Sequence, residues 1–114
     1  MSKLMGEMVL MRIFIGEAKK HGHRPLYEAL VELFLAEGFA GATVLKGVVG
    51  FGAHRVYHTQ KLLELSTDLP MVVEVVESQE KIDAIMPKVD EMIESGMITL
   101  EKATVIRYAH KHEK

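Results

Sequence analysis

The sequence contains no cysteine and no tryptophan, and only three of its 114 residues are proline. The absence of cysteine excludes disulfides, thiol nucleophiles and thiolate metal sites, and it fits a reducing compartment. No apolar run is long enough to span a membrane, and Lys3 is followed by no apolar block of the signal-peptide type. We therefore expect a cytoplasmic protein that does not insert into membranes.

Neither sign of charge is in large excess, because 14 Lys and Arg stand against 16 Asp and Glu and give a formal net charge of -2 at pH 7. Proteins that bind duplex nucleic acid gain much of their affinity from clustered lysine and arginine. No such cluster occurs, so nucleic acid is not an expected partner. With 48% apolar and 26% charged residues, the composition is that of one folded domain. We expect residues 1–114 to form a single domain with an ordered core at about 8–109.

Apolar, β-rich segments alternate along the chain with amphipathic ones. Strands are predicted at 8–15, 42–49, 71–76 and 98–108, and helices are predicted after Pro25 and Ser78. Gly38 and Gly96 mark the expected helix ends, and Pro87 predicts a kink or a late start in the second helix. The resulting order βαββαβ predicts an α+β, ferredoxin-like sandwich, with a four-stranded antiparallel-type sheet and both helices on one face.

The predicted strands at 8–15 and 71–76 are the most continuously apolar, which favours the two central places in the sheet. The first is apolar at nearly every position, and the second is apolar in both parities apart from Glu74. Helices cover only one face of such a sheet, so a monomer would expose a contiguous apolar patch of a size that is rare in soluble monomers. We therefore expect a homo-oligomer that packs the open faces together.

A glycine-rich run, which includes Gly47, Gly50 and Gly52, leads into a long loop at 51–70. Glycine allows the backbone to turn and a ligand to approach closely, and backbone amides can cradle a phosphate. Loops of about twenty residues are uncommon in small domains and often carry function. Taken alone, the run fits a tight turn into a long loop better than it fits a ligand site.

Several spaced motifs together resemble the PII signal-transduction proteins, and more closely a PII-like family of small bacterial and archaeal proteins. The motifs are PLYEALVE at 25–32, GATV at 41–44, GFG at 50–52, DLP at 68–70 and VIRY at 105–108. The match extends over nearly the whole chain. The resemblance implies a homotrimer that binds an adenine nucleotide (AMP, ADP or ATP) in clefts between subunits. It also implies signalling through the 51–70 loop to an unidentified protein or transporter partner.

The resemblance implies an adenine side and a phosphate side for the nucleotide. The start of the second predicted strand matches the segment that reads the adenine, where a backbone group and a threonine hydroxyl meet the polar edge of the base; its residues are Gly41, Ala42 and Thr43. Ser95 and Gly96 match a phosphate-side loop. Arg107 matches a strand arginine that faces phosphates, and its planar guanidinium can donate two hydrogen bonds to one phosphate.

The base of the long loop, which the resemblance places around ribose and phosphate, departs from the PII pattern. Its matching residues are Gly50, Phe51, Gly52, Ala53 and His54. PII proteins carry arginine and glutamine where this chain has alanine and histidine, and the segment between Gly96 and Arg107 is too short for their lysine-bearing phosphate loop. Both changes remove γ-phosphate ligands, so we expect AMP, ADP or a cyclic nucleotide to compete well with ATP. Arg55 is a candidate substitute cation, and Mg²⁺ a candidate companion of the phosphates.

The histidines give an alternative, a divalent-metal-binding trimer of the metal-tolerance type, which has the same fold. His54 and His58 would share a face if their segment were helical, and His21 and His23 form an i, i+2 pair. Imidazole pairs of this kind can hold zinc or copper. Because no acidic or cysteine partner stands at a fixed spacing, solvated histidines are the simpler interpretation.

An enzymatic function receives less support from the sequence. Hydrolysis of a bound nucleotide would require a positioned general base and, in most cases, ligands for Mg²⁺. Neither can be named from the residue pattern, and no serine, histidine and acid stand at an ordered spacing. We therefore expect a regulatory protein without catalytic residues.

Overall fold

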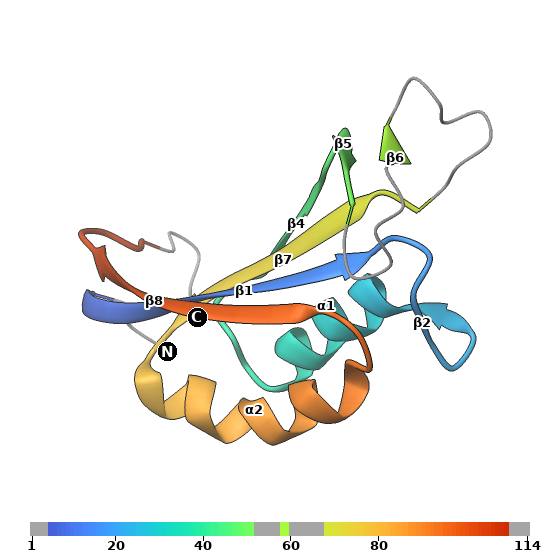
Figure 1. Cartoon of the computed structure of the whole chain (residues 1–114). Helices are drawn as coiled ribbons and strands as arrows, with labels where there is room; N and C mark the ends of the chain where they lie inside the picture. Colours follow the sequence, from blue (N-terminus) through green and yellow to red (C-terminus); the bar gives the residue numbers. More distant parts are fainter. Residues whose placement is uncertain (1–4, 52–57, 60–67, 110–114) are drawn as a thin grey trace.

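The computed structural model describes residues 5–51, 58–59 and 68–109, and it has a four-stranded antiparallel sheet with two helices on one face (Figure 1). In spatial order, the strands of the sheet are β4 (Thr43–Lys46), β7 (Pro70–Glu77), β1 (Gly6–Gly16) and β8 (Met97–Val105). The helices are α1 (Leu26–Ala36) and α2 (Gln79–Met92). Two short hairpins pair β2 (Lys20–His21) with β3 (Arg24–Pro25), and β5 (Val49–Gly50) with β6 (His58–Thr59). The predicted α+β, ferredoxin-like architecture is confirmed.

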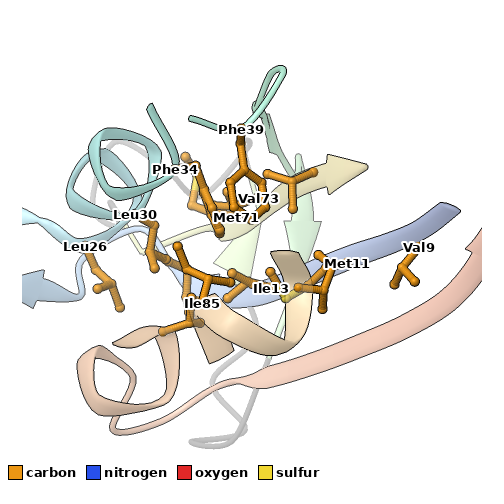
Figure 2. Packing of buried hydrophobic residues seen from close by; sticks show 14 residues of the cluster. Val9, Met11, Ile13, Leu26, Leu30, Phe34, Phe39, Met71, Val73 and Ile85 are labelled. Carbon is orange, nitrogen blue, oxygen red and sulfur yellow. The ribbon is translucent and has the colours of Figure 1, made fainter. Parts of the chain in front are cut away.

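The core lies between the helices and the two central strands, β1 and β7. Alternate side chains of both strands are buried beneath the helices. Ile13 of β1 pairs with Val73 of β7 near the middle of the core. From α1, Leu30 and Phe34 have no exposed surface, as their spacing of one helical turn predicts. Figure 2 shows the labelled side chains of α1, β1 and β7 gathered in this space. Continuous apolar character therefore correctly predicted which strands are central.

The opposite face of the sheet is not covered by any element of the described chain, and apolar and polar rows alternate across it. One row is apolar and crosses all four strands: Leu45, Val72, Phe14 and Met97. The next row contains Arg12, which donates hydrogen bonds to Glu74 at 2.8 Å and to Glu101 at 2.5 Å. These bonds, the one to Glu74 first, raise the pKa of Arg12 above its ordinary value. The open face is thus less uniformly apolar than the strand patterns indicate.

The end of α1 is fixed by a Schellman motif, as predicted from Gly38. Gly38 has a positive φ of 79°, and its N–H donates to the carbonyl of Leu35 at 3.2 Å. The N–H of Phe39 donates to the carbonyl of Phe34 at 3.0 Å, and the two rings pack with centroids 5.0 Å apart. This is the hydrogen-bond and hydrophobic pattern of the motif. It turns the chain from α1 toward β4.

The strand predicted at 42–49 is divided in the structure. β4 ends at Lys46, and the N–H of Gly47 donates to the carbonyl of Pro70 at 2.7 Å. The chain then leaves the main sheet, because β5 pairs with β6 and not with β7. The apolar residues Val48 and Val49 at this point are exposed. A β-rich composition therefore did not distinguish a continuous strand from two short ones.

The second helix starts after Ser78, as predicted, but ends before the glycine that was expected to terminate it. The Ser78 side chain accepts a hydrogen bond from the N–H of Lys81 at 3.2 Å and caps α2 at its first turn. Pro87 lies inside the helix and does not delay its start. The helix ends at Met92, before Gly96. Of the helices in the described ranges, none is long and apolar enough to cross a bilayer.

A charge pair ties the β2–β3 hairpin to α1. The guanidinium of Arg24 donates to both carboxylate oxygens of Glu32, and Glu28 lies 3.6 Å from it. Hydrogen bonding to Arg24 lowers the pKa of Glu32, and the same bond raises the pKa of Arg24. The exposed pair makes only a small contribution to stability, but it fixes the hairpin against the helix.

We expect an NMR titration of the Glu32 carboxyl to give a midpoint below that of an ordinary glutamate, and Arg24→Gln to raise it. Because the folded pKa is the lower one, the pair stabilises the fold above the pKa of Glu32 in the unfolded chain. That contribution is lost as the pH falls through the folded pKa. An unchanged midpoint in Arg24→Gln would contradict the assignment.

Candidate functional site

The connection between α1 and β4, which contains Gly41 and Ala42, is held in place by a buried carboxylate. Glu77 is 2% exposed at the end of β7 and accepts a hydrogen bond from the N–H of Ala40 at 3.0 Å. The ammonium group of Lys81 lies 3.7 Å from this carboxylate and donates to the carbonyl of Gly38 at 2.5 Å. Buried charges persist when they are paired and hydrogen-bonded in this way. The segment predicted to meet adenine therefore has a defined backbone.

The segment after β8 meets the same connection. The hydroxyl of Tyr108 donates to the carbonyl of Ala40 at 3.5 Å. Arg107, its neighbour, is exposed and has no hydrogen bond or ion pair with another residue of the described chain. The last strand, predicted to reach residue 108, ends at Val105, so Arg107 lies beyond the sheet. One chain thus places Arg107 close to the start of β4, where Thr43 lies exposed opposite Glu74.

The base of the long loop lies at the other end of β4. A Cβ atom built on Gly50 would come within 2.9 Å of the Pro70 Cγ, so β5 runs directly against the start of β7. Phe51 is 58% exposed, although it is a large apolar residue. Four residues with predicted roles lie outside the described residues: Gly52, Ala53, His54 and Arg55.

The turn between α2 and β8, which contains Ser95 and Gly96, packs against the end of β1. A Cβ atom on Gly96 would come within 2.7 Å of the Phe14 carbonyl oxygen, so glycine is required for this close approach. β8 has nine residues, and its two ends are about 26 Å apart at about 3.3 Å per residue. Gly96 precedes one end and Arg107 follows the other. A single chain therefore does not bring both to the same phosphate group.

A hollow of about 590 Å³ lies between the β2–β3 hairpin and the C-terminal end of α2. Its lining consists of Lys19, Lys20, His21, Gly22, Leu26, Glu91, Met92, Glu94 and Ser95. Ser95 is a predicted nucleotide-binding residue, and the others were not expected to share a site. The sequence carries no signal for this juxtaposition, because the two halves are about 70 residues apart and no motif links them.

The histidines provide no metal centre in the part of the chain that the structure describes. Among those residues, no three histidine or acidic side chains are grouped so that they could hold a metal ion. His21 and His23 are both exposed in the β2–β3 hairpin. His58 lies in β6, and its alternative partner His54 is outside the described residues. The alternative metal site therefore stays a prediction.

Sequence comparison finds relatives along most of the chain. The model of a family described as DUF190, uncharacterized ACR, COG1993, matches residues 8–105. A UPF0166 protein of Aquifex aeolicus is 35% identical over 97 residues, which cover 85% of this chain and 91% of the relative. A UPF0166 protein of Methanocaldococcus jannaschii is 30% identical over 99 residues, covering 86% of this chain and 91% of the relative.

Solved structures of CPII, a nitrogen regulatory PII-like protein from Thiomonas intermedia K12, share this fold. The complex of CPII with ADP, AMP and bicarbonate gives a TM-score of 0.60 at 18% identity, covering 89% of this chain and 90% of CPII. The complex with ADP and bicarbonate gives 0.58 at 19% identity, with coverage of 89% and 90%. The likeness is one of fold, and it agrees with the fold that the resemblance to PII-like proteins implies.

Proposed function

Because the chain belongs to the DUF190 (UPF0166) family and has the fold of a PII-like protein, we propose that it binds an adenine nucleotide between the subunits of a homotrimer. AMP and ADP bind in preference to ATP. The nucleotide acts as an effector and is not turned over. Its presence is signalled through the 51–70 loop to a protein or transporter. The CPII complexes with ADP and AMP support this class of ligand.

Two groups of candidate residues lie at opposite ends of β8, and this separation is the main support for a cleft formed by two copies of the chain. Arg107 lies with the start of β4, whereas Ser95 and Gly96 lie beyond the opposite end of β8. The two groups can contact one nucleotide only when the Arg107 end of one copy meets the Ser95 end of another. An exposed arginine without a partner in the described chain suits a phosphate that arrives with the ligand.

The open face of the sheet supports the oligomer. Its apolar row passes through the half-buried side chains of the two central strands and continues onto exposed residues of both edge strands. Leu45 is 48% and Met97 is 54% exposed in one chain. Burying such a row between copies removes apolar surface from water. Beside this row, the guanidinium of Arg12 is already hydrogen-bonded within its own chain to the carboxylates of Glu74 and Glu101, so it keeps charged partners when the face is covered.

The proposed preference for AMP and ADP follows from the residues at the loop base. Where PII proteins carry γ-phosphate ligands, this chain has Ala53 and His54, and its segment between Gly96 and Arg107 is too short for their lysine-bearing phosphate loop. A ligand at Gly50 and Phe51 lies where the long loop begins. If the ligand interacts better with one loop conformation than with the others, binding shifts the population toward it. This population shift is the proposed signal to the partner.

Arg107→Ala is expected to weaken ADP binding by about tenfold or more, because a hydrogen bond to a charged group contributes about 1.5–3 kcal/mol. Isothermal titration of the full chain with AMP, ADP and ATP, with and without Mg²⁺, measures the change. We expect the mass of the oligomer to be unchanged.

The matched control is Lys102→Ala, which removes a cation from β8 that is 85% exposed and 3.6 Å from Glu7. Its ADP affinity should equal that of the unmodified chain. Equal affinity in Arg107→Ala would refute the assignment of Arg107, and absence of binding by any of the three nucleotides to the unmodified oligomer would refute the function.

A further inference from the structure

The hollow between the β2–β3 hairpin and α2 has a polar lining that the proposed nucleotide cleft does not use, apart from Ser95. Its volume of about 590 Å³ is within the range of small-molecule sites. Leu26, 3% exposed, and Met92 form the apolar part of the lining. Ligand sites commonly combine such an apolar part with a few polar groups that orient the ligand.

The two sides of the hollow carry opposite charges. The hairpin contributes Lys20 and His21, and the last turns of α2 and the residues after it contribute Glu91 and Glu94. The C-terminal end of a helix adds partial negative charge to the acidic side. Within the described ranges, no ion pair joins Lys20 to either glutamate. The opposite charges therefore stand across the hollow without neutralising each other.

This charge pattern discriminates between classes of ligand. An anion attracted by Lys20 is repelled by Glu91 and Glu94. A cation attracted by the two glutamates is repelled by Lys20. A molecule with both an anionic and a cationic group satisfies the two sides at once. The ligand must also be small, because the hollow is bounded by a short hairpin and one helix end.

We propose that the hollow binds a small zwitterionic metabolite of the amino-acid or dipeptide class. Its carboxylate lies against Lys20 and His21. Its ammonium group lies against Glu91 and Glu94. This second site goes beyond the proposed nucleotide function and does not depend on it.

The turn between β1 and β2 connects the hollow to both flanks of the long loop. The N–H of Ala18 donates to Asp68 Oδ1 at 2.9 Å, and the N–H of Glu17 donates to the carbonyl of Leu69 at 2.8 Å. On the other flank, the ammonium group of Lys46 lies 3.1 Å from the Glu17 carboxylate. A ligand that fixes the hairpin also restrains this turn, so amide signals of Ala18 and Leu69 should report its binding.

The test is an NMR titration of the full chain with the standard amino acids and diglycine, using succinate and putrescine as probes of a single charge sign. We expect saturable binding of at least one zwitterion, tighter than that of either single-sign probe. Lys20→Ala and Glu94→Gln should each weaken this zwitterion by about tenfold, through loss of one charged hydrogen bond. Glu94→Gln should not weaken succinate, and Lys102→Ala should change neither ligand.

Three results would overturn the proposal: no zwitterion binds, succinate binds more tightly than every zwitterion, or both variants keep full affinity. ADP titrations of the same proteins separate this site from the nucleotide cleft. Lys20→Ala should retain its ADP affinity, and Arg107→Ala should retain its affinity for the zwitterion. The two titrations can therefore refute the zwitterion site and the nucleotide cleft independently of each other.

Discussion

Phe14→Glu is expected to separate the proposed homotrimer into monomers and to lower ADP affinity by about a hundredfold or more. Phe14 lies on a central strand, between Val72 and Met97 in the apolar row of the open face. An uncompensated charge buried between copies costs about 3–5 kcal/mol, which corresponds to more than a hundredfold. Nucleotide binding falls with assembly, because the proposed cleft needs two copies.

Sedimentation equilibrium measures the mass, and isothermal titration measures ADP binding. The matched control is Leu35→Glu, which places the same charge on α1 at a side chain that is 77% exposed. The control should remain trimeric and bind ADP normally, and circular dichroism should show both variants folded. A trimeric, ADP-binding Phe14→Glu protein would refute the role of the open face.

Phe34→Ala is expected to lower the free energy of unfolding by about 3–5 kcal/mol, which is the usual effect of truncating a fully buried phenylalanine. Phe34 has no exposed surface, and its ring packs against Phe39 at the end of α1. A small domain has a total stability of about 5–15 kcal/mol. The variant should therefore be close to unfolding at physiological temperature.

Urea denaturation followed by circular dichroism gives the free energies for this comparison. Leu35→Ala provides the control on the adjacent residue of the same helix, because Leu35 is 77% exposed. Its stability should change by less than about 0.5 kcal/mol. If the two alanine variants lost the same stability, the placement of Phe34 in the core would be wrong.

The fold was largely predictable because each strand's place in the sheet determines its composition. β1 and β7 are covered by neighbours on both edges, and their apolar residues in both parities predicted this. The end of α1 was predictable from Gly38, because a positive φ favours glycine. In both cases a few adjacent residues determine the structural feature.

The wrong boundaries arose where tertiary contacts decide the structure. The sequence around Lys46 does not indicate that β4 ends there. The next N–H, that of Gly47, donates to the carbonyl of Pro70, which is distant in the sequence. The hairpin of β2 and β3 has no signal in the sequence, since strands of two residues show no period. The late start that Pro87 allowed does not occur, because Ser78 caps the helix at its first turn.

The candidate site was predictable only as separate segments. Motif resemblance indicated the start of β4, the loop base, the α2–β8 turn and Arg107, but not that β8 holds the last two far apart. That separation depends on how many residues of the last strand pair with β1. The charged hollow was not predicted, because its two sides are distant in the sequence and come together only in the folded chain.

The base of the long loop is closed before the loop begins, since Gly47 is bonded to Pro70 and Glu17 contacts both flanks. The entropy of closing a loop rises only logarithmically with its length, so doubling the length costs about 0.6 kcal/mol. The free energy of unfolding of the scaffold therefore depends only weakly on the length of the loop. Insertions, deletions and substitutions can accumulate in that segment over evolution while the core sequence stays the same, so one scaffold can acquire new partners at little cost in stability.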